Sequence, residues 1–356
     1  MVIDYRIIIL NMIPSAILPL MFQLLAHELG HMLAGSLSGW RMIYLQLFRI
    51  ALVKENKRLR IKTVPSYSYR CIMYPKSICL DASLYTLGGI MINLLLTAVG
   101  LLGMLKYFRH PVIWMYAMGL FLFGMMLVIT NGIPNIGRVC NDMACMQIMK
   151  NNQVSKKAHN CQMIIAHQLF EGQTYRQMDK RLLVVGNKRI NTDILAYHAV
   201  LEYYLHLDED EYTLAQKALD RIEPDAPISR EVSNIISMER LYLNLILIIL
   251  RNEFSTNSNS MKQEEIDKIM RANEIKGDIH SVRVKAVGMA YSYYIEGKLE
   301  IAIKWLDQCI REMVDMRYLY LGEKLFCIDQ LTGLRNMLQR DYVTMSKVEA
   351  TVENYQ

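Results

Sequence analysis

Charge is scarce in the first 150 residues, and acidic residues are scarcest. This part holds 14 Lys and Arg against 5 Asp and Glu, a net charge of +9, whereas residues 151–356 hold 26 and 29, a net charge of −3. The asymmetry argues against a uniform soluble enzyme and predicts two domains, 1–152 and 153–356. The seven cysteines have no regular spacing, which argues against a disulfide framework and fits a reducing compartment.

Three runs in the first half lack Asp, Glu, Lys and Arg altogether: Ile7–His27, Ala82–Leu105 and Pro111–Gly137. Each is long enough to cross a bilayer core, which needs about 20 apolar residues as a helix. We expect transmembrane helices at about 7–36, 82–106 and 111–137. A cleaved secretory signal is the alternative for the first run, but that run continues into histidines and a glutamate rather than a cleavage site.

The loop between the first two runs sets the expected orientation. Residues 41–76 carry nine basic residues against one acid, Glu55. Basic loops stay on the cytoplasmic side, so the N-terminus should lie outside and the chain after about residue 150 inside. The expected location is a bacterial cell membrane, with the C-terminal domain in the cytoplasm.

Two histidines and an acid stand at the end of the first run and just beyond it, in the segment AHELGHMLAG. His27 and His31 are four residues apart and so share one helix face, with Glu28 beside them. A charge at the centre of a bilayer costs about 2.5–3.5 kcal/mol on insertion scales, so this acid needs a partner. The pattern predicts a Zn²⁺ site with His27 and His31 as ligands.

A catalytic zinc usually has three protein ligands, so one more is needed. Asp142 follows the third run in the segment NGIPNIGRVCNDMACM and should lie at the same depth as the histidines. An interfacial carboxylate paired with Arg138 is the alternative for Asp142. Cys140 and Cys145 are further candidate ligands, although packing is the more ordinary use of such cysteines.

Three motifs stand in a recognisable order: HELGH, a glycine-rich stretch ending in Asn (Gly88, Gly89 and Asn93), and an N-x-x-P segment ahead of an aspartate (Asn131, Pro134 and Asp142). On these motifs, residues 7–150 resemble the site-2 protease family of zinc-dependent intramembrane proteases. The chain departs from the family at Asn141-Asp142-Met143, where the family usually has Asp-Gly.

The resemblance implies a three-helix metalloprotease core that hydrolyses a peptide bond within a membrane. The expected substrate is a single-span membrane protein or a hydrophobic peptide precursor, cut near the cytoplasmic face. Glu28 would be the general base. Asn93 would donate a hydrogen bond to the oxyanion or to the substrate backbone, with a polar helix–helix contact as its alternative role.

Alternating apolar residues over 43–48 and 59–61, with a turn at 54–57, predict a small β-hairpin at the membrane surface. The resemblance implies a similar β-element in the family. Its edge could hold an unwound substrate segment as an added strand. Alternatively, the basic hairpin rests on anionic headgroups, and both uses are compatible.

The second half predicts amphipathic helices, with a polar surface loop at 252–262. Residues 286–310 resemble a tetratricopeptide repeat, with Ala290, Tyr293, Gly297 and Ala302 at its small, aromatic, turn and small positions, and 199–219 are a weaker match. We expect an all-α polytopic membrane protein with a cytosolic solenoid of such repeats, which would bind a cytosolic protein partner; a simple helical bundle is the alternative.

Two functions from different classes remain open on the sequence. The first is the zinc endopeptidase described above. The second is a catalytically inert, membrane-anchored scaffold or receptor that acts through its helical domain. Nucleic acid is not an expected partner, because the basic residues gather at the membrane edge and the second half is net negative.

Overall fold

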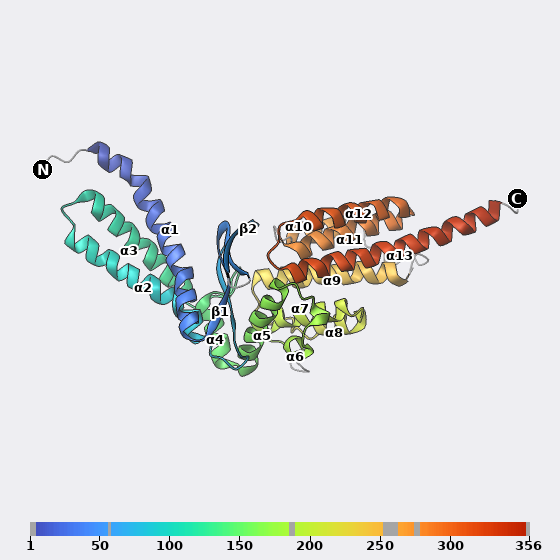
Figure 1. The fold of residues 1–356 in the computed structure, drawn as a ribbon, viewed down its shortest axis with the longest axis horizontal. Helices are drawn as coiled ribbons and strands as arrows, with labels where there is room; N and C mark the ends of the chain where they lie inside the picture. Colours follow the sequence, from blue (N-terminus) through green and yellow to red (C-terminus); the bar gives the residue numbers. More distant parts are fainter. Residues whose placement is uncertain (1–4, 56–57, 185–188, 252–262, 274–277, 354–356) are drawn as a thin grey trace. The chain divides into compact units, whose positions relative to one another are not determined.

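Helices dominate both halves of the chain in the computed structural model, which describes residues 5–55, 58–184, 189–251, 263–273 and 278–353 (Figure 1). The chain divides into two compact units, Met1–His167 and Gln168–Gln356. The first part of the chain forms α1 (Tyr5–Leu37), β1 (Trp40–Glu55), β2 (Arg58–Pro75), α2 (Ser83–Lys106), α3 (Pro111–Gly132), α4 (Asp142–Asn151) and α5 (Gln153–Phe170). The rest forms η1 (Tyr175–Gln177), α6 (Lys180–Leu183), α7 (Asp193–Asp208), α8 (Tyr212–Asp220), α9 (Arg230–Arg251), α10 (Gln263–Asn273), α11 (Ile279–Ile295), α12 (Leu299–Asp315) and α13 (Leu321–Glu353).

The charge-free runs form α1, α2 and α3, which pack against one another. α2 turns its small and polar side toward the other two helices, burying Thr86, Gly88, Gly89, Asn93, Thr97 and Gly100. Its large apolar side chains point outward, including Leu94, Leu95, Leu102 and Leu105. This arrangement is the reverse of a soluble bundle and suits helices whose outer surface meets lipid.

By length and composition, α1, α2, α3 and α9 could each cross a membrane. The first three were expected, but α9 was not. In α9, 56% of the apolar stretch is buried inside the protein, against 17%, 28% and 22% of the corresponding stretches of α1, α2 and α3. α9 therefore buries its apolar side chains by packing within unit 2, as a core helix does.

The third helix ends earlier than the sequence predicted. α3 stops at Gly132 rather than at residue 137, because Pro134 lacks the backbone N–H that would continue the helix. The chain then makes a short loop and starts a new helix, α4, at Asp142. Asp142 thus begins a separate helix instead of following a continuous span.

β1 and β2 form the expected hairpin, a two-stranded antiparallel sheet. The pairing runs from Trp40 opposite Pro75 to Glu55 opposite Arg58, which is longer than the apolar alternation had indicated. Two of the four residues predicted to turn the hairpin, Asn56 and Lys57, lie outside the described residues. The base of the hairpin is fastened to α2, since Trp40 stacks on Tyr85 with the ring centroids 4.6 Å apart.

The two units divide within α5, between His167 and Gln168, rather than at residue 152. The first part of α5 is held by the loop that precedes α2. The Asn160 side chain donates hydrogen bonds to the carbonyls of Ile78 and Leu80, at 2.7 and 2.8 Å. Composition could not locate this boundary, because these bonds join residues about 80 positions apart.

Two helical hairpins in unit 2 occupy the segments that resembled tetratricopeptide repeats. α11 and α12 pack together across a turn in which Gly297 has a positive φ of 72°, and they bury Ala290 and Ala302. α7 and α8 form a similar pair. The repeat architecture itself stays a prediction, and the polar loop expected at 252–262 lies outside the described residues.

A buried ion pair links α9 to α11 in the core of unit 2. The Arg283 guanidinium donates to Glu239, and their side chains are 0% and 1% exposed. Tyr204 donates a second hydrogen bond to the Glu239 carboxylate at 3.0 Å, and the Arg283 guanidinium lies 4.0 Å from the centre of the Tyr242 ring. Losing one charge would leave the other buried and unbalanced.

We expect Glu239→Gln to destabilise unit 2 by about 3–5 kcal/mol, the usual cost of breaking a buried pair. Hydrogen exchange of α9 and α11 in the full chain would measure it as faster exchange. Asp267→Asn is the matched control, because its partner Arg271 lies on an exposed helix surface. Equal protection of the α9 and α11 amides from exchange in the two variants would contradict this role of the ion pair.

Candidate metal centre

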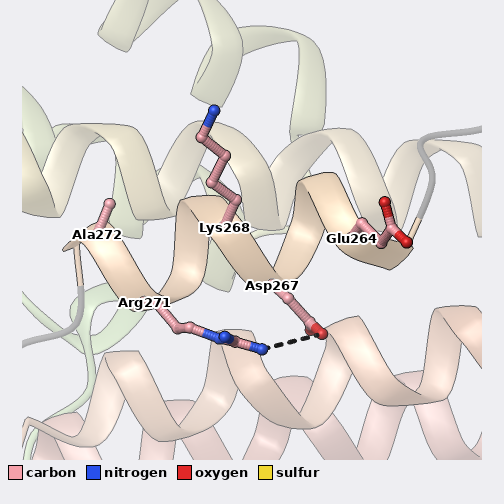
Figure 2. A pocket seen from close by; sticks show the side chains of 5 residues that line it. All are labelled: Glu264, Asp267, Lys268, Arg271 and Ala272. Carbon is pink, nitrogen blue, oxygen red and sulfur yellow. Dashed lines mark ion pairs between the residues drawn. The ribbon is translucent and has the colours of Figure 1, made fainter.

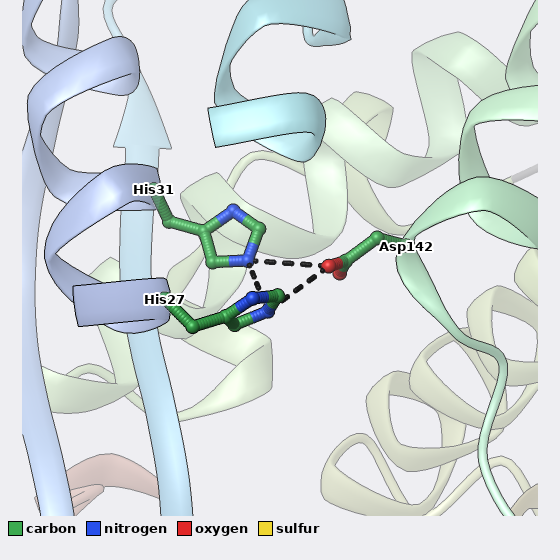
Figure 3. A group of neighbouring side chains, drawn as sticks. All are labelled: His27, His31 and Asp142. Atoms are coloured by element: carbon green, nitrogen blue, oxygen red, sulfur yellow. Dashed lines mark hydrogen bonds and ion pairs between the residues drawn. The ribbon is translucent and has the colours of Figure 1, made fainter. Parts of the chain in front are cut away.

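Three side chains from two elements converge in unit 1 (Figure 3). His27 and His31 project from one face of α1, and Asp142 reaches them from the first turn of α4. The Asp142 Oδ2 atom lies 3.2 Å from His27 Nε2 and 3.3 Å from His31 Nε2. The two Nε2 atoms are 3.1 Å apart. The structure therefore brings together all three residues that the sequence selected as ligands.

The spacing of these three atoms suits a tetrahedral metal ion. Ligand atoms about 2.0–2.1 Å from zinc and at the tetrahedral angle lie about 3.3–3.4 Å from one another. The observed edges of 3.1, 3.2 and 3.3 Å are close to that value. Two imidazoles and one carboxylate, with a fourth position left for water, are also the donor set of catalytic zinc.

The carboxylate is in the protonation state that a ligand requires. Burial acts to raise the pKa of Asp142, but in the metal-free protein Nε2–H hydrogen bonds and positive charge from His27 and His31 outweigh it and hold the pKa at about 2. Asp142 is therefore an anion at neutral pH. A bound metal ion would take the place of those Nε2 protons. The alternative partner for this residue, Arg138, is itself exposed in the loop before α4.

His31 is fixed in the tautomer that frees Nε2 for a metal. Its Nδ1 lies 2.7 Å from the Tyr85 carbonyl oxygen of α2, which can only accept a hydrogen bond. Nδ1 must therefore carry the ring proton and donate it. Such a second bond from a ligating histidine to a carbonyl is the usual way to orient the ring.

Gly89 allows the imidazoles to lie against α2. A Cβ atom at this position would stand 2.5 Å from His27 Cε1 and 2.6 Å from His31 Nε2, closer than atoms can approach. One residue earlier, a Cβ atom on Gly88 would stand 2.4 Å from the backbone carbonyl oxygen of Gly30 in α1. These glycines let α1 and α2 cross closely, and Gly89 also makes room for the site.

Asn141 places Asp142, a role that the sequence did not reveal. Its Nδ2 donates to the carbonyls of Thr130 and Ile133 at the end of α3, both at 2.7 Å. Its Oδ1 accepts from the backbone N–H of Asn135 and, as the N-cap of α4, from that of Ala144. One carboxamide thus ties α3, the loop and α4 together immediately before the ligand.

Glu28 is buried beside the ligands, with 7% of its surface exposed. Its carboxyl is within hydrogen-bond reach of the Cys71 backbone on β2. Burial, with the Glu28 charge adding to it, raises the pKa of Cys71 to about 12, and this thiol is not part of the ligand cluster. The acid therefore lies between the metal ligands and the hairpin.

Of the other residues that the sequence singled out, Asn93 contacts the ligand cluster and the rest do not. Asn93 is fully buried, and its Nδ2 lies 3.1 Å from Nδ1 of His27. Asn131 donates to the Leu127 carbonyl within the last turn of α3, a local bond rather than a site contact. Cys140 and Cys145 do not belong to the ligand cluster and make weak sulfur contacts to nearby carbonyls.

Unit 2 holds a second group of ligand-type side chains, which sequence spacing did not indicate. His206 Nδ1 lies 2.8 Å from Glu211, and Glu209 completes the group. Glu209 is already paired with Lys180, and Glu211 is exposed. The buried group in unit 1 is therefore the stronger metal site.

A surface pocket on α10 carries charge but no metal ligands of the histidine or cysteine type. It is lined by Glu264, Asp267, Lys268, Arg271 and Ala272. Arg271 and Asp267 pair with each other at 3.8 Å, and Lys268 points away from them (Figure 2). Side chains that diverge from a single helix do not surround a ligand, so we assign this pocket no chemistry.

Comparison of the chain with protein-family models, curated proteins and solved structures found no match.

We expect Gly89→Ala to remove the metal, because the new methyl group would take the space of both imidazoles. Zinc content should fall from about one equivalent to near zero, measured by elemental analysis of the full chain in detergent. Gly132→Ala is the control, since no atom lies within 4 Å of the added Cβ. Full zinc in Gly89→Ala would mean that the histidines are not the ligands.

We expect Asn141→Ala to weaken zinc binding by about 10–100-fold, as is usual when a group that orients a ligand is lost. Asp142 itself would remain but would no longer be held at the start of α4. A chelator competition titration would measure the change. Asn135→Ala, in the exposed part of the same loop, is the control and should leave the zinc affinity unaltered. An equal loss of zinc affinity in both variants would show that any change in this loop weakens binding.

Proposed function

We propose that this protein is an intramembrane zinc endopeptidase that hydrolyses a peptide bond of a membrane protein or hydrophobic peptide near the cytoplasmic face. The observation that carries the proposal is the convergence of His27, His31 and Asp142 beside the buried acid Glu28. A metal ligand set next to a carboxyl group is the arrangement of a metal-assisted hydrolase. The helix α1 that supplies three of these residues is apolar enough to lie in a bilayer.

His27, His31 and Asp142 would hold the ion. When bound, zinc would polarise the scissile carbonyl and lower the pKa of its water toward about 7. Glu28 would accept the proton of that water and deliver it to the leaving amine, which returns Glu28 to the carboxylate form. Burial keeps bulk water away from Glu28, which favours transfer between the reacting groups.

The hairpin supports a role in holding substrate. A peptide bond in a helix is shielded, so a substrate has to unwind before it can be cut. β1 pairs with β2 alone in the described sheet, which leaves strand edges for an added segment. Trp40 and Cys71 tie this sheet to Tyr85, the residue whose carbonyl orients His31. A segment bound at the edge would therefore be coupled to the metal ligands.

The membrane topology and the helical unit complete the proposal. α1, α2 and α3 would span the membrane of a bacterial cell with the N-terminus outside, as the basic loop of residues 41–76 favours. Unit 2 would then lie in the cytoplasm. Its paired helices α7–α8 and α11–α12 resemble repeat hairpins and would recruit a substrate or a regulatory protein.

Glu28→Gln tests the mechanism. Cleavage should be abolished, because the amide cannot accept the proton, while about one equivalent of zinc is retained since none of the three ligands has changed. Each variant would be co-expressed with tagged single-span proteins from the same genome neighbourhood, and new N-termini would be mapped by mass spectrometry. Glu300→Gln, the same chemical change on the exposed face of α12, is the matched control.

The results separate the protease from an inert scaffold. Zinc in the wild type together with cleavage that Glu28→Gln abolishes supports the protease. Undiminished cleavage by Glu28→Gln removes the mechanism. A wild-type chain without stoichiometric metal would instead favour a scaffold, and one equivalent of iron in place of zinc would point to a different chemistry of the same ligand set.

A further inference from the structure

The Asn93 side chain of α2 is in contact with the ligand cluster. It is 0% exposed, and its carboxamide nitrogen Nδ2 is 3.1 Å from Nδ1 of His27. Nδ1 is the ring nitrogen that faces away from Asp142, since Nε2 is the atom at 3.2 Å from that carboxylate. Asn93 therefore touches the outer side of a metal ligand.

Metal binding dictates what this contact must do. Nε2 of His27 can bind an ion only through its lone pair, so a neutral imidazole must carry its proton on Nδ1. A buried N–H on Nδ1 then needs an acceptor, because leaving it unpaired costs about 1–3 kcal/mol. The carboxamide of Asn93 is the group in hydrogen-bond contact with Nδ1.

The carboxamide has an acceptor to offer. Its Oδ1 is buried and has no hydrogen-bond partner among the described residues. A half-turn about the Cβ–Cγ bond exchanges Oδ1 and Nδ2 with almost no change of shape. Oδ1 would then accept from Nδ1–H of His27, and Nδ2 would take the buried position that Oδ1 now holds.

We propose that Asn93 is a positioning residue, which holds His27 in the Nδ1–H tautomer through its carboxamide oxygen and so presents Nε2 to the metal. The inference rests on the metal site of the proposed function. This role uses Oδ1 and is distinct from the oxyanion role expected for Asn93, which would use the Nδ2 donor and stays a prediction. Residues 85, 89 and 93 follow one another at four-residue steps, so one face of α2 orients His31, makes room for both rings and orients His27.

The experiment compares one substitution that removes the acceptor with one that keeps it. Asn93→Leu keeps the size but removes the acceptor, whereas Asn93→Asp keeps an acceptor and adds a charge. Zinc affinity of the full chain in detergent would be measured by chelator competition, and the visible spectrum of the Co²⁺-loaded protein would report ligand geometry. Thr86→Val is the control, a buried polar residue of the same helix whose hydroxyl bonds the Ala82 carbonyl.

We expect Asn93→Leu to weaken zinc binding by about 10–100-fold and to alter the Co²⁺ spectrum, as loss of an orienting acceptor does. Asn93→Asp should bind within a few-fold of the wild type, since a carboxylate also accepts from Nδ1–H. A merely structural role predicts the opposite order, because a buried charge disturbs packing more than leucine does. If Asn93→Leu does not fold, Asn93→Ala takes its place with the same expectation.

Two outcomes overturn the inference: wild-type affinity in Asn93→Leu, or weaker binding in Asn93→Asp than in Asn93→Leu. Neither outcome contradicts the proposed function, which fails instead if the wild-type chain binds no metal at all. The two failures are therefore distinguishable in the same titration.

Discussion

The close approach of α1 and α2 is the constraint on which the rest of the first unit depends. At Gly88 the two backbones are in contact through Gly30, and at Gly89 the imidazoles of His27 and His31 fill the space that a side chain would need. A larger residue at either glycine would push the helices apart. The ligands would then lose the acceptors that α2 provides, and Asp142 would no longer reach both rings.

The same contact explains how polar groups are tolerated among apolar helices. The outward faces of α1, α2 and α3 carry large apolar side chains, and the inward face of α2 carries small and polar ones. In apolar surroundings a polar group needs a partner, and here each imidazole has one on both sides, from α2 and from α4. A bound cation would complete this network by balancing the Asp142 carboxylate.

The three converging residues could be predicted from spacing and segment order, whereas the hydrogen bonds that position them could not. The pair His27 and His31 follows from helical spacing alone, and Asp142 from its position after the third apolar run. The end of α3, the clamp by Asn141 and the tautomer partner of His27 all depend on hydrogen bonds between separate segments. The ion pair of Glu239 with Arg283 could not be predicted from the sequence either, because it joins residues 44 positions apart and depends on how the core of unit 2 packs.

The departure from Asp-Gly at Asp142 has a structural explanation. Asp142 is the first residue of α4 and Met143 the second, and among the described residues other than glycine only Phe48 and Asp210 have a positive φ. Position 143 therefore needs no glycine. What the turn does need is a group that can donate to two carbonyls and accept from two N–H groups, and Asn141 meets all four with one carboxamide. An aspartate there would place a carboxylate against the carbonyl oxygens of Thr130 and Ile133, so the order Asn-Asp, and not the reverse, presents the anion to the histidines.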